Sequence, residues 1–186
     1  MVLGYGGKKN AATSGSGSGD AHEAQMMASL RLMHQRSQAL YETINVDKPS
    51  DLSILRLGSI GARSEGIRQA VMSAASDVRA TKTLSAAQVN EITSFVAKNM
   101  VELIERSMEL SRGLLRERCE SLGMGFPTAV KMALARLRDA VKDLNEALEA
   151  ACPAEQLEEV KEIDKRCLDP VVDTIKAYAS VPAAPA

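Results

Sequence analysis

Residues 85–122 are the longest stretch of this chain that can continue as one helix, and they limit how the other segments can pack. The stretch begins with Ser85 and Gln88, the S-x-x-Q pattern of a capping box. It contains no proline, and Gly113 is its only glycine. At roughly 1.5 Å per residue, such a helix would be about 55 Å long. We therefore expect other helices to pack on its flanks, and a bend no earlier than Gly113, towards Cys119.

The remaining segments also carry the spacing of amphipathic helices. Leu134, Leu137, Leu144 and Leu148 belong to the most regular apolar seam, with alternating steps of three and four residues. Turn signals separate the expected helices, which cover residues 20–44, 49–83, 85–122, 126–151 and 153–180. Short links between long helices favour antiparallel neighbours. The sequence predicts an all-α, up-and-down bundle of four to five helices.

The expected domain organisation is simple. Residues 20–180 form the bundle, residues 1–19 form a flexible Gly/Ser-rich arm, and residues 181–186 form a frayed tail. Hydrophobic residues make up 45% of the 186, but aromatic residues only 3%, so the core consists of Leu, Ala, Val, Ile and Met. This composition favours helices over strands.

Charge and cysteine content exclude several classes of function. The net charge of −1 argues against a nucleic-acid-binding protein. Cys119, Cys152 and Cys167 form no C-x-x-C motif, so we expect reduced thiols rather than a zinc or redox site. No apolar run is long enough to cross a bilayer. We expect a cytoplasmic protein, with organelle import as the alternative.

Motifs for catalysis or metal binding are missing from the sequence. His22 and His34 are the only histidines, and neither has a partner at the spacing of a zinc or di-iron helix. His34 could serve phosphotransfer in a helical domain, but a histidine at the rim of the bundle is the simpler interpretation. The expectation is a protein without a cofactor or metal and without enzymatic activity.

Three features suggest binding to other proteins. The N-terminal arm carries Tyr5, Lys8 and Lys9 on flexible glycine joints. Methionines are common on adaptable binding surfaces, which makes Met26, Met27 and Met33 candidates, although core packing explains them as well. Arg56 and Arg63 lie seven residues apart on one helix face and could contact an acidic partner, or could simply be solvated.

The glycines of residues 58–66 permit two interpretations. Gly58, Gly61 and Gly66 lie inside an expected helix, where each costs roughly 1 kcal/mol relative to alanine. They could break the helix as a hinge, or they could allow a neighbouring helix to approach closely. Close packing against the 85–122 helix is the favoured expectation.

In composition and helix length alone, the chain resembles the talin and vinculin rods. The leading hypothesis is a structural or adaptor protein that binds protein partners within a larger, multi-subunit assembly. A secretion or export chaperone that shelters a client helix is the alternative hypothesis. An enzyme or phosphotransfer module ranks third. Neither nucleic acid nor a membrane span is expected, and a homo-oligomer is left open.

Overall fold

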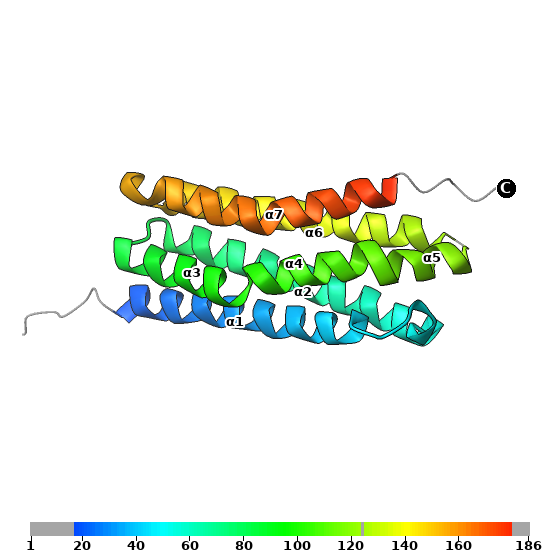
Figure 1. Cartoon of the computed structure of the whole chain (residues 1–186). Helices are drawn as coiled ribbons and strands as arrows, with labels where there is room; N and C mark the ends of the chain where they lie inside the picture. Colours follow the sequence, from blue (N-terminus) through cyan, green and yellow to red (C-terminus); the bar gives the residue numbers. More distant parts are fainter. Residues whose placement is uncertain (1–16, 124, 180–186) are drawn as a thin grey trace, which may run out of the picture.

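Five helical rods run alternately up and down along a common axis, so the predicted all-α bundle is confirmed (Figure 1). The structure is a computed structural model that describes residues 17–123 and 125–179. Its rods are α1 (Gly17–Ile44), α2 (Ile54–Thr81), a third rod composed of α3 (Ala86–Asn99), α4 (Val101–Leu110), a π-helical turn η2 (Ser111–Leu115) and α5 (Arg116–Leu122), then α6 (Phe126–Ala151) and α7 (Leu157–Ala179). Single 3₁₀ turns precede α2 (Pro49–Asp51) and α7 (Ala154–Gln156).

Capping side chains explain where two of the rods begin. The Ser85 hydroxyl accepts from the Gln88 N–H at 3.3 Å, and the Gln88 side chain accepts from the Ser85 N–H at 2.8 Å, which completes the predicted capping box. The second rod differs from the prediction. Pro49 opens a separate 3₁₀ turn, and Ser53 caps α2 by accepting from the Arg56 N–H at 3.2 Å.

The third rod is interrupted earlier than expected. The Asn99 amide donates to the Phe95 carbonyl at 2.8 Å and competes with the backbone ladder, so α3 ends at Asn99 and α4 starts after Met100. The second interruption, η2, contains Gly113, where the sequence indicated a bend. The rod is therefore three helical segments joined without a loop, and not one unbroken helix.

The glycine stretch of α2 is neither a hinge nor a close crossing. Helix α2 continues through it without a break. Cβ atoms built at Gly58 and Gly61 would meet nothing within 4 Å, and the nearest atom to one at Gly66 belongs to the flexible side chain of Arg36, at 3.7 Å. The expected close packing against the third rod is wrong, because Gly58 and Gly61 are exposed and Gly66 faces Arg36 of α1.

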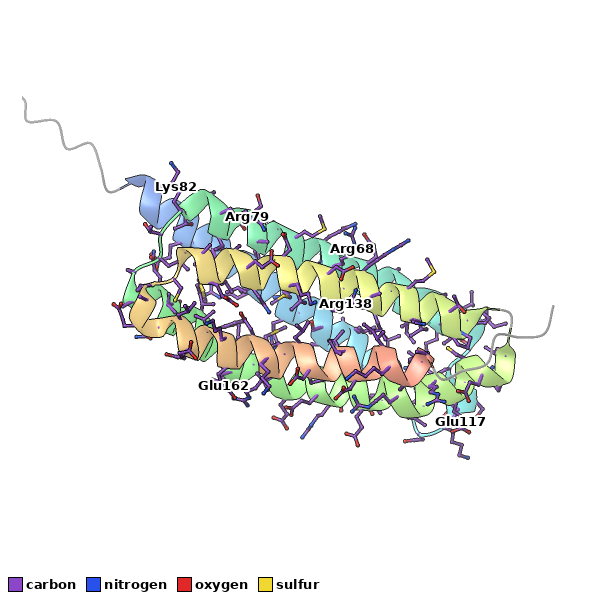
Figure 2. The ribbon with its side chains drawn as sticks, turned by 90° about the horizontal axis from the view of Figure 1, so that it is seen from above. Arg68, Arg79, Lys82, Glu117, Arg138 and Glu162 are labelled. Carbon is purple, nitrogen blue, oxygen red and sulfur yellow. The ribbon has the colours of Figure 1, made fainter. Side chains whose placement is uncertain are left out.

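The rods close into a ring. Helix α1 packs along α2, α2 along α6, α6 along α7, and α7 along α3 and α4, which return to α1. Seen from above, α1 runs beneath the space between α6 and α7 (Figure 2). An ion pair and a hydrogen bond also connect separate segments of the ring. Arg79 pairs with Asp143 between α2 and α6, and Arg118 of α5 donates to the Leu52 carbonyl, just before α2, at 2.9 Å.

Candidate functional site

A cavity lies inside the ring, between the apolar faces of all five rods. The volume of the cavity is about 100 Å³. All the empty space in this region, including the open solvent at the mouth of the cavity, is about 1070 Å³. The lining residues are Leu30, Met33, Ser37 and Leu40 of α1; Ile67 and Val71 of α2; Leu84; Val89, Ile92, Thr93 and Val96 of α3; Met100, Ile104, Ser107 and Met108 of the third rod; Leu137, Val141, Leu144, Asn145 and Leu148 of α6; and Val160, Ile163, Asp164, Cys167 and Val171 of α7.

The side chains of this lining explain why the centre is hollow. Almost all of it is Leu, Ile, Val or Met; the exceptions are Ser37, Thr93, Ser107, Asn145, Asp164 and Cys167. None of the lining residues is aromatic. A ring of five rods surrounds more space than a four-helix bundle, and branched aliphatic side chains of this size leave part of it unfilled. The site is an apolar cavity of the kind that accepts hydrocarbon.

Two of the polar groups in the lining are already satisfied by the protein. The Thr93 hydroxyl donates to the Glu159 carboxylate at 2.7 Å, and the Ser107 hydroxyl donates to the Leu103 carbonyl at 2.7 Å. The first bond joins α3 to α7 and the second lies within α4, so both hydroxyls have partners inside the protein. They add little polarity to the cavity.

Asn145 and Asp164 form the one polar pair of the lining that remains incompletely bonded. With its nitrogen facing Asp164, the Asn145 amide donates to Asp164 Oδ1 at 3.1 Å and to the Val141 carbonyl at 3.0 Å. Asp164 Oδ2 is buried and has no hydrogen-bond partner among residues 17–123 and 125–179. A buried carboxylate oxygen without a donor is costly, so this atom is available to a bound molecule.

Burial is the main influence on the protonation of Asp164. It raises the pKa of the carboxyl group to about 7, and the negative charge of Glu149 on α6 adds to the effect. The hydrogen bond from Asn145 favours the ionised form and acts in the opposite direction. Asp164 therefore changes protonation near neutral pH.

The cysteines do not form a reactive site. Cys167 lies in the lining one turn after Asp164, and burial raises the pKa of its thiol to about 12. Burial also raises the pKa of Cys119 to about 11, and that of Cys152. All three are free and keep their protons at neutral pH, which makes them poor nucleophiles.

The structure places the predicted partner-binding residues apart from one another. Met26, Met27 and Met33 are buried, with exposed fractions of 1%, 5% and 8%, so they fill the core and offer no surface to a protein partner. Met33 lines the cavity. Arg56 is half-buried and Arg63 exposed on α2, and neither lines the cavity.

The other candidates from the sequence are either outside the described residues or away from the cavity lining. Tyr5, Lys8 and Lys9 lie outside the described residues, as do the proposed arm up to residue 16 and the tail after residue 179. His34 packs edge-on against Phe95, with ring centroids 6.1 Å apart. In the part of the chain that the structure describes, no three His, Cys, Asp or Glu side chains gather as metal ligands.

The cavity itself was missed by the sequence analysis. A lining residue such as Ile92 has the same spacing as a residue of a filled core, so periodicity does not distinguish the two. The available signals were weak: the scarcity of aromatic residues, and Asn145 and Asp164 on the inner faces of two strongly patterned helices.

The hydropathy of the helices agrees with the expectation of no membrane span. None of the helices within residues 17–123 and 125–179 combines the length and the apolar character that crossing a bilayer needs.

Comparison with known proteins finds likeness in structure alone. No protein-family model matches the sequence, and no curated protein does. Ligand-binding domain 1 of the Penicillium marneffei MP1 protein, complexed with arachidonic acids, superposes with a TM-score of 0.70 at 14% identity, over 84% of this chain and 98% of that domain. AFMP4P in complex with palmitic acid gives a TM-score of 0.75 at 17% identity, over 84% and 99%. Ligand-binding domain 2 of MP1, with arachidonic acids, gives 0.66 at 15%, over 83% and 94%.

These findings correct the functional hypotheses from the sequence. A structural or adaptor protein with protein partners in a multi-subunit assembly, and the alternative of an export chaperone for a client helix, are both wrong, because the solved structures that superpose on this chain, the MP1 domains and AFMP4P, hold arachidonic or palmitic acid. The physical reason for the error is that apolar helix faces were assigned to protein contacts, whereas they surround a cavity. The chain shares the fold of these fatty-acid-bound domains.

Proposed function

We propose that this protein binds a lipid with a long alkyl chain, such as a fatty acid, in the cavity between its five rods. The observation that carries the proposal is the lining: aliphatic side chains from every rod enclose a continuous space with very few polar groups. The proteins that share the fold hold arachidonic or palmitic acid, which favours the same class of ligand.

The energetics of burial favour such a ligand. Each methylene group moved from water into an apolar cavity contributes about 0.8 kcal/mol. A long chain therefore gains enough to exceed the loss of its own freedom, whereas a short or polar molecule does not. Thr93 and Ser107 do not oppose entry of the chain, because their hydroxyls already have partners.

A blocking substitution tests the proposal. Val141 is half-buried and lines the cavity from α6, so Val141→Trp should occupy the space intended for the chain. We expect delipidated wild-type protein to bind palmitic acid in a calorimetric titration, and the variant to bind it at least about tenfold more weakly. The circular dichroism spectrum of the variant should remain helical.

Met132→Trp is the matched control. Met132 lies on the same helix but is 51% exposed, so a tryptophan there adds the same side chain outside the cavity. The control should bind palmitic acid like the wild type. Equal binding by Val141→Trp and the wild type, or failure of both to bind palmitic acid and 1-hexadecanol, the alcohol of equal chain length, would contradict the proposal.

A further inference from the structure

The polar pair in the cavity wall indicates which end of a ligand could rest there. Asn145 extends from α6 and Asp164 from α7, and both line the same cavity. The two amide hydrogens of Asn145 are used by Asp164 Oδ1 and the Val141 carbonyl, at 3.1 and 3.0 Å. The pair therefore presents Asp164 Oδ2, without a partner inside the protein, as the atom that needs a hydrogen-bond donor.

The charges around Asp164 disfavour an anionic head. No cation forms an ion pair with Asp164 among the residues that the structure describes. The charge that acts on it is that of Glu149, which is also negative. Its neighbour Cys167 is a neutral thiol, on which Arg166 acts as a positive charge and Glu105 of α4 as a negative one. A carboxylate head would meet the negative charges of Asp164 and Glu149 here, and no cation pairs with Asp164 to offset them.

A hydroxyl group fits the same position in either protonation state of Asp164. It can donate to Oδ2 when Asp164 is ionised, and it can accept from Oδ2 when Asp164 is protonated. A carboxylate has no proton to donate and fits only when Asp164 carries one. The geometry thus separates alcohol heads from carboxylate heads.

We propose that Asp164, oriented by Asn145, anchors the uncharged hydroxyl head of a long-chain lipid and discriminates against a carboxylate head of equal chain length. This inference rests on the proposed function and deepens it, because it names the chemical class of the head. The preferred ligand class is a long-chain alcohol or the hydroxyl end of a neutral lipid, and fatty acids bind well only when Asp164 is protonated.

A matched pair of ligands tests the inference. Delipidated protein is loaded with diphenylhexatriene, a neutral fluorescent hydrocarbon, and the probe is displaced with 1-dodecanol or with laurate, which have chains of equal length. At about pH 9, where Asp164 is ionised, dodecanol should bind about 10- to 100-fold more tightly than laurate. At about pH 5 the difference should shrink to less than about threefold.

The Asp164→Asn variant shows whether this residue is the cause. An amide can donate to a carboxylate, so the variant should bind laurate about tenfold or more tightly than the wild type at about pH 9, and it should lose the preference for dodecanol over laurate. Glu162→Gln is the control, because it removes one negative charge from the same turn of α7 at an exposed position (Figure 2). It should leave the preference of the wild type intact.

The possible failures are distinguishable. If the probe binds but the wild type holds both ligands equally at about pH 9, or if the preference survives in Asp164→Asn, the inference is overturned while the proposed function stands. If neither the probe nor the two ligands bind, the proposed function fails and the inference fails with it. The comparison of ligands in the wild type requires no variant, so a misfolded variant does not remove the test.

Discussion

At the scale of the residue, Asp164 is the least expected feature of this protein. The sequence places it within a run of acids on α7, most of which are solvated. Its partner Asn145 and the cavity become neighbours only when α6 and α7 pack together, so sequence spacing alone could not identify the pair.

Asp164 should make the stability of the empty protein depend on pH. Because its folded-state pKa is raised from 3.8 to about 7, the folded state holds a proton more tightly than the unfolded state between these values. Stability from this group is therefore lost as pH rises from about 4 to about 7 and levels off above it. At about 1.4 kcal/mol per pKa unit the shift would correspond to more than about 4 kcal/mol, and partial exposure of the carboxyl group to solvent reduces the expected loss to roughly 2–4 kcal/mol. Urea unfolding across this range measures it.

In Asp164→Asn, this part of the pH dependence should be absent. The exposed Glu162→Gln serves again as the control and should follow the wild type. An unchanged slope between about pH 4 and 7 in Asp164→Asn would show that another group is responsible.

Tyr178 should stabilise the irregular part of the third rod. Its hydroxyl donates to the carbonyl of Ser111, in the π-helical turn, at 2.8 Å, and the side chain is only 3% exposed. Tyr178→Phe leaves that buried carbonyl without this donor and should lower the free energy of unfolding by about 1–3 kcal/mol in urea titrations.

Tyr41→Phe is the control for this measurement. Tyr41 is half-buried, and within the described residues its hydroxyl has no hydrogen bond. A loss no greater for Tyr178→Phe than for Tyr41→Phe would mean that the bond to Ser111 contributes nothing to stability.

At the scale of the element, the sequence predicted the rods well and their irregularities less well. The seam of α6 is buried as expected at Leu134, Leu137, Leu144 and Leu148, because a strict repeat allows only one inner face. The end of α3 depends on a side-chain bond from Asn99 that periodicity does not register. Helix α7 continues through Pro170, although a proline inside a helix usually kinks or ends it.

Burial at the start of α2 depends on tertiary packing and not on apolar character alone. Leu55 is apolar, yet it is 85% exposed, because α2 begins only at Ile54 and its first turn lies at the end of the bundle. Leu52, three residues earlier, is fully buried in the preceding turn.

The outward glycines of α2 should be replaceable at a gain in stability. At Gly58 and Gly61 an added Cβ meets nothing within 4 Å, and alanine is favoured over glycine by about 0.5–1 kcal/mol inside a helix. The double variant Gly58→Ala, Gly61→Ala should raise the free energy of unfolding by about 1–2 kcal/mol.

Gly125→Ala should have the opposite effect. Gly125 has a φ of +77°, in the left-handed region, which disfavours any residue with a Cβ.

Thermal and urea unfolding measure the stability of these variants. If the double variant Gly58→Ala, Gly61→Ala were less stable than the wild type, α2 would have to pack differently from the structure described.

At the scale of the whole molecule, the number of rods creates the site. The short links between helices predicted the up-and-down arrangement. They did not predict that the rods close into a ring around an unfilled centre, because this depends on how closely the apolar faces of the helices pack together. Val71, Ile92 and Val141 would suit a filled core equally well. The sequence therefore predicted the fold and missed the cavity.

Ligand affinity should follow alkyl chain length if the chain occupies this cavity. Each added methylene contributes about 0.8 kcal/mol, so saturated fatty acids should bind about fourfold more tightly per carbon until the cavity is full. Calorimetric titration with a series of saturated acids measures the slope. Affinity that did not change with length would indicate that the head alone is recognised, or that the acids bind to the surface.

The most direct measurement is an NMR experiment that detects contacts between ¹³C-labelled palmitic acid and the methyl groups of the protein. The account predicts nuclear Overhauser effects from the alkyl chain to the methyl groups of Ile67, Val71 and Ile92, which line the cavity from α2 and α3. Contacts only to Ile54 and Leu55, which are 56% and 85% exposed at the start of α2, would contradict it and place the lipid on the outer surface.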